Sequence, residues 1–310
     1  MTMRWKRLGL VYRPDGTRAW AKSHAMIPTP VRLNDRVVRV YITCCDAAGI
    51  GRPGYVDLAA DARLTVLGVA PEPLLDVGAP GTFDENGVLP CSVVAVGGNR
   101  VLMYYVGFEL GTKIRYRLLT GLATSDDGGN SFRRWTQTPL LERSTAELYF
   151  RAGPYCVRDG DKFRLWYVGG SAWTTVAGKS VPVYDIRYAE SADGVAWPTE
   201  GALQIAVTQP DEHGFGRPAV LRKADGTYRM FYSVRRISSA GYRLGYAESP
   251  DGHGWIRRDD HLQLDVSSDG FDSQAIMYAA PIEIGGRLYV FYNGNEFGKY
   301  GFAAAVLDDE

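Results

Sequence analysis

The sequence predicts an all-β fold, a five-bladed β-propeller whose blades are four-stranded antiparallel sheets. Two regularities predict it. A proline recurs five times, with steps of 60, 64, 64 and 63 residues, at Pro30, Pro90, Pro154, Pro218 and Pro281. Each proline opens a short apolar run, and a pair that ends in tyrosine follows 11 to 15 residues later: Val40-Tyr41, Tyr104-Tyr105, Trp166-Tyr167, Phe231-Tyr232 and Phe291-Tyr292. We call these five segments repeats 1 to 5, in chain order.

Each repeat continues into a third short run that we expect to be a strand. These runs cover residues 54–57, 121–123, 186–189, 244–247 and 300–303. Three of them lead into a turn of one type, at 125–132, 191–197 and 249–255, in which an Asp-Gly pair supplies the positive φ that a tight hairpin needs. An aromatic residue then begins a fourth strand, at Trp135, Trp197 and Trp255.

The last repeat ends at its third strand, so we expect the beginning of the chain to supply the fourth. Residues 4–10 read like the fourth strands of the other repeats, with Trp5 in the place of their tryptophans. Pairing the two ends would close the last blade and remove two exposed sheet edges. We therefore expect one domain over residues 1–310. The alternative, an open pair of β-sheets, does not explain the five-fold spacing.

Composition bears on the class of partner. The chain has 35 basic and 35 acidic residues, so neither nucleic acid nor a membrane surface is an expected partner. No segment approaches about 18 uninterrupted apolar residues, and the N-terminus lacks the apolar core of a signal peptide, so we expect a cytoplasmic protein. We expect neither a metal nor another cofactor. No zinc spacing is present, and buried thiols are expected at Cys44, Cys45, Cys91 and Cys156.

We place the candidate site in the loops that enter the innermost strand of each blade, because these loops differ while the strands around them repeat. They span residues 22–30, 83–90, 146–154, 211–218 and 271–281. Several acids around one cavity suit glycoside cleavage, in which one carboxyl protonates the leaving oxygen and another attacks or activates water. The alternative is that each acid caps a turn at a strand entry. The predicted catalytic residues are Asp84, Glu85, Glu147 and Asp272.

Cationic side chains share these loops. Arg151 and Arg217 either orient the acids through ion pairs or hold an anionic part of the substrate, because a guanidinium binds carboxylate and phosphate with two parallel hydrogen bonds. A neutral sugar has no need of such charge. The predicted substrate-binding residues are His24, Arg151, His213, Arg217, Tyr278, Asn293 and Asn295.

Aromatic and amide side chains complete the predicted substrate site. Tyr278, Trp173 and Phe150 offer flat apolar faces on which sugar rings can stack, although core packing is the alternative for most aromatic residues. Asn293 and Asn295 lie in the string FYNGNEFGKYGF and carry both a donor and an acceptor for sugar hydroxyls. The alternative for these two amides is a role in local turns.

The repeats, the loop FDENG before Pro90 and the segments GFDSQAIMY and LYVFYNGNEFGKYGF resemble a group of bacterial proteins described as glycosyl-hydrolase-like. These are similar to the five-bladed superfamily of arabinanases, levansucrases and invertases, glycoside hydrolase families 32, 43, 68 and 130, and many accompany surface-polysaccharide genes. The resemblance covers essentially the whole chain. It implies a propeller that takes a small-molecule or oligosaccharide substrate.

The resemblance also implies roles for particular positions. In those hydrolases one catalytic Asp lies in the first blade, a second acid in blade two and the proton-donating Glu in blade three. Glu85 or Asp84 matches the second position, and Glu147 is the nearest match to the donor. The first position differs, because His24 stands there in place of a carboxylate. Asp272 of the fifth repeat is our own candidate for that role.

We therefore expect a carbohydrate-active enzyme that cleaves or transfers a glycosyl group in the central channel. Three alternatives stay open. The resemblance to mannoside phosphorylases implies a single acid, with Arg151, Arg217 and a histidine binding phosphate. The same channel could bind a glycan or an anionic metabolite without turnover. The scaffold could also host chemistry unrelated to sugars.

Overall fold

The computed structural model describes residues 2–239 and 241–309, and strands form nearly all of its regular structure. In this part of the chain the helices are short: α1 (Asp259–Leu262), α2 (Asn295–Gly298) and the 3₁₀ turn η1 (Gly270–Asp272). The prediction of an all-β protein is therefore confirmed. Among the described residues, no helix has the length and apolar character needed to cross a membrane.

The chain divides into two compact units, which we describe separately. The first unit comprises Met1–Pro73, Ala219–Val234 and Ser239–Glu310, and the second unit comprises Leu74–Pro218 and Arg235–Ser238. The expectation of one domain over residues 1–310 stays a prediction, as do the number of blades and the closure of a ring.

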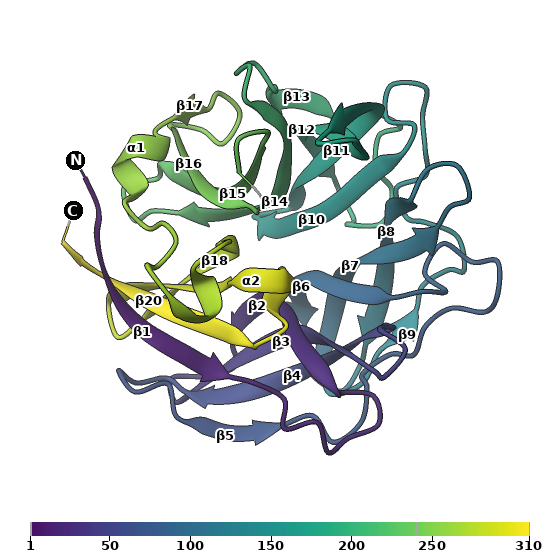
Figure 1. Ribbon diagram of the computed structural model, residues 1–310. Coiled ribbons are helices and arrows are strands. Elements are labelled where there is room, and N and C mark those ends of the chain that lie inside the picture. Colours follow the sequence, from purple (N-terminus) through teal and green to yellow (C-terminus); the bar gives the residue numbers. More distant parts are fainter. Residues whose placement is uncertain (1, 240, 310) are drawn as a thin grey trace. The chain divides into compact units, whose positions relative to one another are not determined.

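The first unit contains antiparallel sheets whose strands follow one another in chain order. Repeat 1 forms β2 to β5, repeat 4 contributes β15 to β17, and repeat 5 forms β18 to β20 (Figure 1). Their bounds are β2 (Ser23–Arg32), β3 (Val37–Cys45), β4 (Gly51–Ala59), β5 (Val66–Val69), β15 (Tyr228–Arg236), β16 (Arg243–Ser249), β17 (Ile256–Arg257), β18 (Met277–Ile284), β19 (Arg287–Asn293) and β20 (Phe302–Asp309). In this unit, repeats 1 and 5 thus belong to two separate four-stranded sheets.

The first and last strands of the chain pair with each other. β1 (Arg4–Tyr12) lies antiparallel beside β20, with Trp5 opposite Leu307, and Figure 1 shows the two strands side by side. Trp5 also donates its indole N–H to the Leu262 carbonyl oxygen at 2.7 Å. The N-terminal segment is therefore the outer strand of the repeat 5 sheet, as predicted.

The second unit contains the sheets of repeats 2 and 3. The strands are β6 (Val88–Gly97), β7 (Arg100–Leu110), β8 (Tyr116–Ser125), β9 (Arg133–Arg134), β10 (Phe150–Asp159), β11 (Lys162–Val176), β12 (Lys179–Ser191) and β13 (Ala202–Ile205). Each repeat is antiparallel internally, whereas β8 and β10 meet in a short parallel pairing. β14 (Glu212–Arg222) pairs in parallel with β12 at Gly214 and continues into the first unit.

The predicted second strands form the core of each unit. They are β3, β7, β11, β15 and β19, and every residue of the five tyrosine-ending pairs is at most 1% exposed. Burying a large side chain of this kind contributes about 1.5–3 kcal/mol, so these pairs are a principal source of stability. The four cysteines are free and buried, as predicted.

The turns that precede the outer strands differ in one detail from the prediction. Trp135 does not begin a strand but follows β9, and Trp197 stands five residues before β13. In the repeat 3 turn, Trp197 donates its indole N–H to the Gly194 carbonyl at 3.1 Å and packs edge-on against Tyr104. Trp197 therefore stabilises the Asp-Gly turn, and the outer strand β13 begins only after this residue.

Candidate functional site

Four of the five repeats contain the same buried contact. The second-strand tyrosine donates its hydroxyl to a carboxylate, and an arginine pairs with the same carboxylate; we call these groups the carboxylate triads. In three of them the arginine comes from the outermost strand, β9, β17 or β1. The triads are Asp84–Tyr105–Arg134, Glu147–Tyr167–Arg151, Asp259–Tyr232–Arg257 and Asp272–Tyr292–Arg7.

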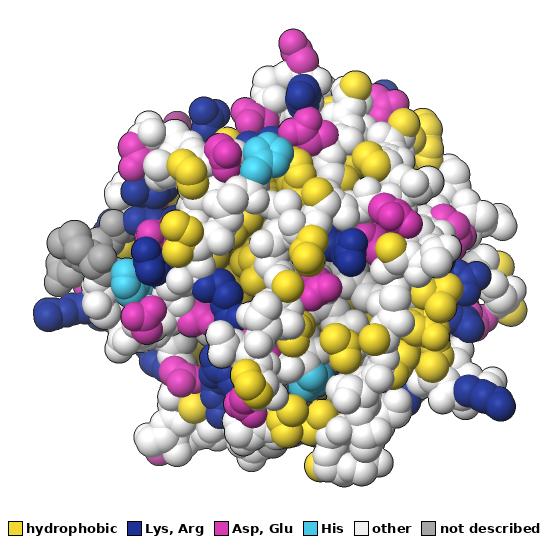
Figure 2. All heavy atoms as spheres, turned by 90° about the horizontal axis from the view of Figure 1, so that it is seen from above, with side chains coloured by type: hydrophobic (Ala, Val, Ile, Leu, Met, Phe, Trp, Pro, Cys, Tyr) yellow, Lys and Arg dark blue, Asp and Glu magenta, His cyan; other side chains and the backbone are white. Residues whose placement is uncertain are grey.

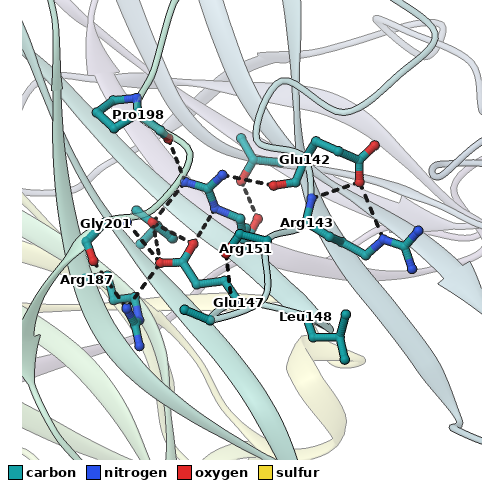
Figure 3. A network of polar contacts seen from close by, with 12 residues as sticks. Glu142, Arg143, Glu147, Leu148, Arg151, Arg187, Pro198 and Gly201 are labelled. Atoms are coloured by element: carbon teal, nitrogen blue, oxygen red, sulfur yellow. Dashed lines mark hydrogen bonds and ion pairs between the residues drawn. The ribbon is translucent and has the colours of Figure 1, made fainter.

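Glu147 has no exposed surface, and Figure 3 shows its carboxylate in contact with Arg151, Arg187 and Gly201. Its carboxylate oxygens accept the Tyr167 hydroxyl at 2.9 Å and the Gly201 amide at 3.0 Å. Arg151 Nε makes a close ion pair with Oε2, and Arg187 Nη1 lies 3.4 Å from Oε1. Two arginines therefore face one carboxylate, so the network carries a net positive charge.

Asp84 and Asp272 are held in the same way. Asp84 accepts the Tyr105 hydroxyl at 3.0 Å and Arg134 Nε at 2.8 Å. Asp272 accepts the Tyr292 hydroxyl at 3.1 Å and Arg7 Nη1 at 2.6 Å. Both carboxylates are at most 2% exposed, so each is a buried ion that is paired and hydrogen-bonded, as a buried charge must be.

The tyrosines of the triads keep their protons. Burial is the largest cause that raises the pKa of Tyr105, Tyr167 and Tyr292, and the neighbouring carboxylate raises each further. A protonated phenol donates its hydrogen bond, which leaves the carboxylate as the acceptor. Each triad therefore joins a neutral donor, a cation and an anion inside one sheet.

Three of the predicted catalytic acids thus make a structural contact that repeats along the chain. Asp84, Glu147 and Asp272 belong to triads that also include Asp259, which lies in none of the predicted site loops. A contact that recurs in four repeats is explained by holding the strands of each sheet together. Glu85 differs, because it is half-buried and belongs to no triad, and its carboxylate accepts the Gly81 amide at 2.7 Å. The catalytic roles of all four stay predictions.

The predicted cationic residues of the second unit also contact protein groups. Arg151 donates to the carbonyl oxygens of Glu142 and Pro198, at 2.9 and 3.2 Å. Arg217 donates to the Cys91 carbonyl at 2.7 Å and is 2% exposed. His213 lies with Nδ1 3.3 Å from the Pro182 carbonyl oxygen, and burial lowers its pKa. The sequence left two roles open for the arginines, an ion pair with one of the acids or a contact with an anionic substrate. The structure contains the ion pair of Arg151 with Glu147.

The two predicted amides of the first unit tie loops together. Asn293 accepts the Ile27 amide at 2.7 Å and donates to the Ala25 carbonyl at 2.8 Å, so it joins β19 to β2. Asn295 accepts the amides of Gln274 and Ala275, at 2.8 and 3.0 Å. These amides therefore shape the loops that carry the other predicted residues.

The same loops hold most of the strained backbone of the described chain. Eight described residues other than glycine have a positive φ, and five of them lie at the start of β2, at the start of β18 and in α2. Such a conformation costs about 1 kcal/mol or more for a residue with a side chain, and it gathers at functional sites. We call these five the strained cluster: His24, Ile27, Tyr278, Glu296 and Phe297.

Two members of the strained cluster, Tyr278 and Phe297, pack against the ring of Tyr242. The Tyr242 ring lies 5.7 Å from that of Tyr278 and 6.3 Å from that of Phe297. Phe297 is 45% exposed, which is unusual for a ring held in a strained backbone conformation. Nearly half of the Phe297 side chain stays exposed, so packing alone does not explain the strain, and Phe297 is a candidate contact for a ligand.

Polar groups stand at the edge of these rings. Glu296 accepts from Lys299 Nζ at 2.6 Å and from the Tyr300 hydroxyl at 2.9 Å, and these bonds lower its pKa. His24 lies beside them, because its amide donates to the Lys299 carbonyl. Burial lowers the pKa of His24, and the charge of Lys299 lowers it further. The cluster thus presents flat rings beside groups that donate and accept hydrogen bonds.

The prediction included His24 and Tyr278 of this cluster and missed the other rings and charges. Phe297 and Glu296 follow Asn295 directly in the string NGNEFG. The signal that could have found them is the density of glycines around them, which predicts an unusual backbone path. Tyr242 gave no such signal, because its place beside Tyr278 depends on the tertiary fold.

No family model matches the chain. Two proteins of Mycobacterium tuberculosis match it along its length: "Uncharacterized protein MT1551" of strain CDC 1551 / Oshkosh and "Uncharacterized protein Rv1502" of strain ATCC 25618 / H37Rv. Each is 33% identical over 309 residues, which cover 99% of this chain and 100% of the relative.

Solved structures show the same fold. A structure titled "Glycoside hydrolase" has a TM-score of 0.76 at 19% identity and covers 100% of this chain and 93% of its own. A thermostable family-43 glycoside hydrolase has a TM-score of 0.64 at 19% identity, over 94% and 91% of the two chains. A GH32 beta-fructofuranosidase of Bombyx mori has a TM-score of 0.60 at 15% identity, over 92% of this chain and 61% of its own. The chain therefore belongs to the family of the two mycobacterial proteins, and its fold is that of the propeller glycosidases of families 43 and 32.

Proposed function

We propose that the protein is glycoside-hydrolase-like in the sense that it binds a saccharide, and that the strained cluster of the first unit makes the contact. The observation that carries the proposal is a group of five strained residues, one of which is the half-exposed Phe297. Strain at one place is maintained where a particular side-chain placement is needed.

The chemistry of the cluster suits a sugar. The faces of Tyr278 and Phe297 are apolar, and the C–H face of a pyranose or furanose ring can pack on them. Lys299, Glu296 and His24 supply donors and acceptors for hydroxyl groups at the edge. A mostly apolar surface with a few placed polar groups is the usual composition of a small-molecule site.

In its finer form the proposal keeps the architecture predicted from the sequence. The five repeats would be five blades, the pairing of β1 with β20 would close the last of them, and the entry loops would surround a central channel. The five regular repeats support this count. A cytoplasmic location and an oligosaccharide partner belong to the same proposal.

The second candidate function is cleavage or transfer of a glycosyl group. Glu85 favours it, because this acid lies in a predicted site loop and is not a member of a carboxylate triad. Glu147 as the general acid has less support, since two arginines and a tyrosine already occupy its oxygens. Phosphorolysis through Arg151 and Arg217 also has less support, since both guanidinium groups already donate to backbone carbonyl oxygens.

A binding experiment tests the proposal. The protein would be applied to an array of neutral, uronate-containing and phosphorylated oligosaccharides, together with Phe297→Ala and the matched control Leu67→Ala, an exposed apolar residue of β5 in the same unit. We expect retained ligands whose affinity falls about tenfold in Phe297→Ala and is unchanged in Leu67→Ala. Failure of the wild-type protein to retain any saccharide would show the proposal to be wrong.

A turnover assay separates binding from cleavage. Retained oligosaccharides would be incubated with the wild-type protein and with Glu85→Gln, and release of reducing ends would be measured. Release that is lost in Glu85→Gln supports cleavage through this acid. Binding without release supports the non-hydrolytic function.

A further inference from the structure

We propose that a second saccharide site lies in the second unit, beside the hairpin of residues 171–183, and that it takes a sugar bearing a carboxylate or a phosphate. The inference rests on the proposed function, because it names a further subsite and a class of ligand for it. The hairpin is the extension of β11 and β12, in which Trp173 pairs with Pro182 across the strands.

Aromatic rings gather at the base of this hairpin. Trp173 lies 5.5 Å from Phe150, 6.0 Å from Tyr116 and 6.2 Å from Tyr149, and Phe150 lies 5.5 Å from Tyr184. Phe150 and Tyr184 are buried, whereas Trp173, Tyr116 and Tyr149 are half-buried. The rings therefore form an apolar surface with a buried floor and an accessible edge. We call these five rings the hairpin cluster.

The indole N–H of Trp173 points to a ligand. Its nitrogen is buried and has no acceptor among the described residues. A buried donor without an acceptor destabilises the folded protein, and most tryptophans in such positions find a partner. A sugar oxygen placed against the edge of the ring would supply that acceptor.

Two nitrogen-bearing side chains border the Tyr184 side of the hairpin cluster. The Arg235 guanidinium carbon lies 6.0 Å from the centre of the Tyr184 ring. His213 contacts the carbonyl of Pro182, the residue opposite Trp173. Arg235 also lies near enough to His213 to lower its pKa, although burial is the larger cause.

This arrangement selects for charge as well as for shape. A guanidinium next to aromatic faces binds a planar carboxylate or a phosphate strongly, because both can accept two of its hydrogen bonds. A neutral sugar would use the rings and the indole N–H of Trp173 but not the charge of Arg235. The hairpin cluster is therefore expected to prefer an acidic sugar over its neutral counterpart.

The array of neutral, uronate-containing and phosphorylated oligosaccharides tests this inference with two variants. Trp173→Ala removes the ring and the donor, and Arg235→Gln removes only the charge. We expect Trp173→Ala to lower the affinity for acidic saccharides about tenfold, and Arg235→Gln to lower it while the affinity for neutral ones is unchanged. The class retained by the wild-type protein decides between carboxylate and phosphate.

Three controls keep the result interpretable. Thr175→Ala is a matched exposed change on the same hairpin and is expected to bind as the wild-type protein does. Trp173→Phe keeps a ring but removes the indole donor, so its affinity is expected to lie between those of the wild-type protein and Trp173→Ala. It replaces Trp173→Ala as the test if that variant folds poorly. Thermal unfolding of each variant identifies those that fold.

The outcomes distinguish this inference from the proposed function. If Phe297→Ala abolishes the binding of acidic saccharides while folded Trp173→Ala and Trp173→Phe bind them normally, the second site is wrong and the first stands. Equal loss of neutral and acidic ligands in Arg235→Gln would overturn the charge preference. If the wild-type protein binds no saccharide, both proposals are wrong.

Discussion

The Tyr167 hydroxyl oxygen lies 2.9 Å from each carboxylate oxygen of Glu147, and neither side chain is exposed to solvent. This contact places a residue predicted to be a general acid inside a structural network. A general acid has to reach the leaving oxygen of its substrate. Here the carboxylate contacts Tyr167 of β11 and two arginines, so it acts mainly on the stability of the repeat 3 sheet.

Glu147→Gln is expected to destabilise the protein strongly. The change leaves Arg151 and Arg187 without the buried carboxylate that neutralises them, and breaking a buried ion pair on one side costs about 3–5 kcal/mol. Urea unfolding would measure the loss. A residue with a catalytic role alone would lose little stability on this change, so the measurement separates the structural role from the catalytic one.

The matched control for this change is Glu142→Gln. Glu142 lies five residues before Glu147, pairs with Arg143 and has a side chain that is 61% exposed, so its substitution should cost less than about 0.5 kcal/mol. Equal free energies of unfolding for Glu147→Gln and the wild-type protein would contradict the structural role of Glu147.

The triads predict a similar cost at each repeat. Tyr105→Phe and Tyr292→Phe each remove the hydroxyl that donates to Asp84 or Asp272 and leave the packing of the ring unchanged. Because a buried carboxylate then loses one donor, each variant should lose about 1–3 kcal/mol in urea unfolding. A cost confined to one of the two would show that the triads are not equivalent.

Phe297→Gly and Phe297→Ala are expected to separate strain from binding. Both remove the ring and should weaken saccharide binding to the same degree. Only glycine relieves the positive φ of 59°, so Phe297→Gly should be about 1 kcal/mol more stable than Phe297→Ala. Thermal unfolding of the two variants measures this difference. An alanine variant as stable as the glycine variant would mean that the backbone at this position is not strained.

Much of the fold could be predicted from the sequence because each repeat carries its own local signals. The tyrosine-ending pairs predicted the buried second strands, and Trp5 predicted the outer strand formed by β1. The tryptophans after the Asp-Gly turns were harder, since whether such a ring begins a strand or closes a turn depends on a tertiary contact. Trp197 packs on Tyr104, which lies in another repeat.

The candidate site could be predicted less well, because composition does not show what a charged side chain contacts. Asp84 and Asp259 look different in the sequence, one in an entry loop and the other after an outer strand, yet both accept a second-strand tyrosine. Conversely, Phe297 reads as one aromatic residue among many. Its importance comes from its backbone conformation, which no residue type specifies.

The four cysteines are expected to resist an aromatic disulfide reagent until the protein unfolds. Burial raises the pKa of Cys45 to about 11 and that of Cys91 to about 12, and it raises the pKa of Cys44 and Cys156 as well. The thiolate is the reactive form, so little of it is present near neutral pH. Absorbance at equilibrium would count the modified thiols with and without urea. Fast modification of the native protein would contradict the buried placement.

His213 is expected to make the protein less stable in mild acid. Burial first, and then the charge of Arg235, lowers the pKa of this imidazole in the folded state from its ordinary value of 6.5. The unfolded chain therefore binds a proton at a higher pH than the folded chain does. The resulting stability is present above pH 6.5 and is lost as the pH falls from 6.5 towards the folded-state pKa.

His213→Gln tests this pH dependence, because glutamine can hydrogen-bond but does not titrate. Urea unfolding at about pH 7.5 and about pH 5.5 should show a smaller loss of stability for His213→Gln than for the wild-type protein. His253→Gln, a change on an exposed turn, is the control and should lose as much as the wild-type protein. Because the pKa of His24 is lowered in the same direction, the double variant His24→Gln/His213→Gln should lose less than His213→Gln. Identical losses in all four proteins would show that these two imidazoles do not set the response to acid.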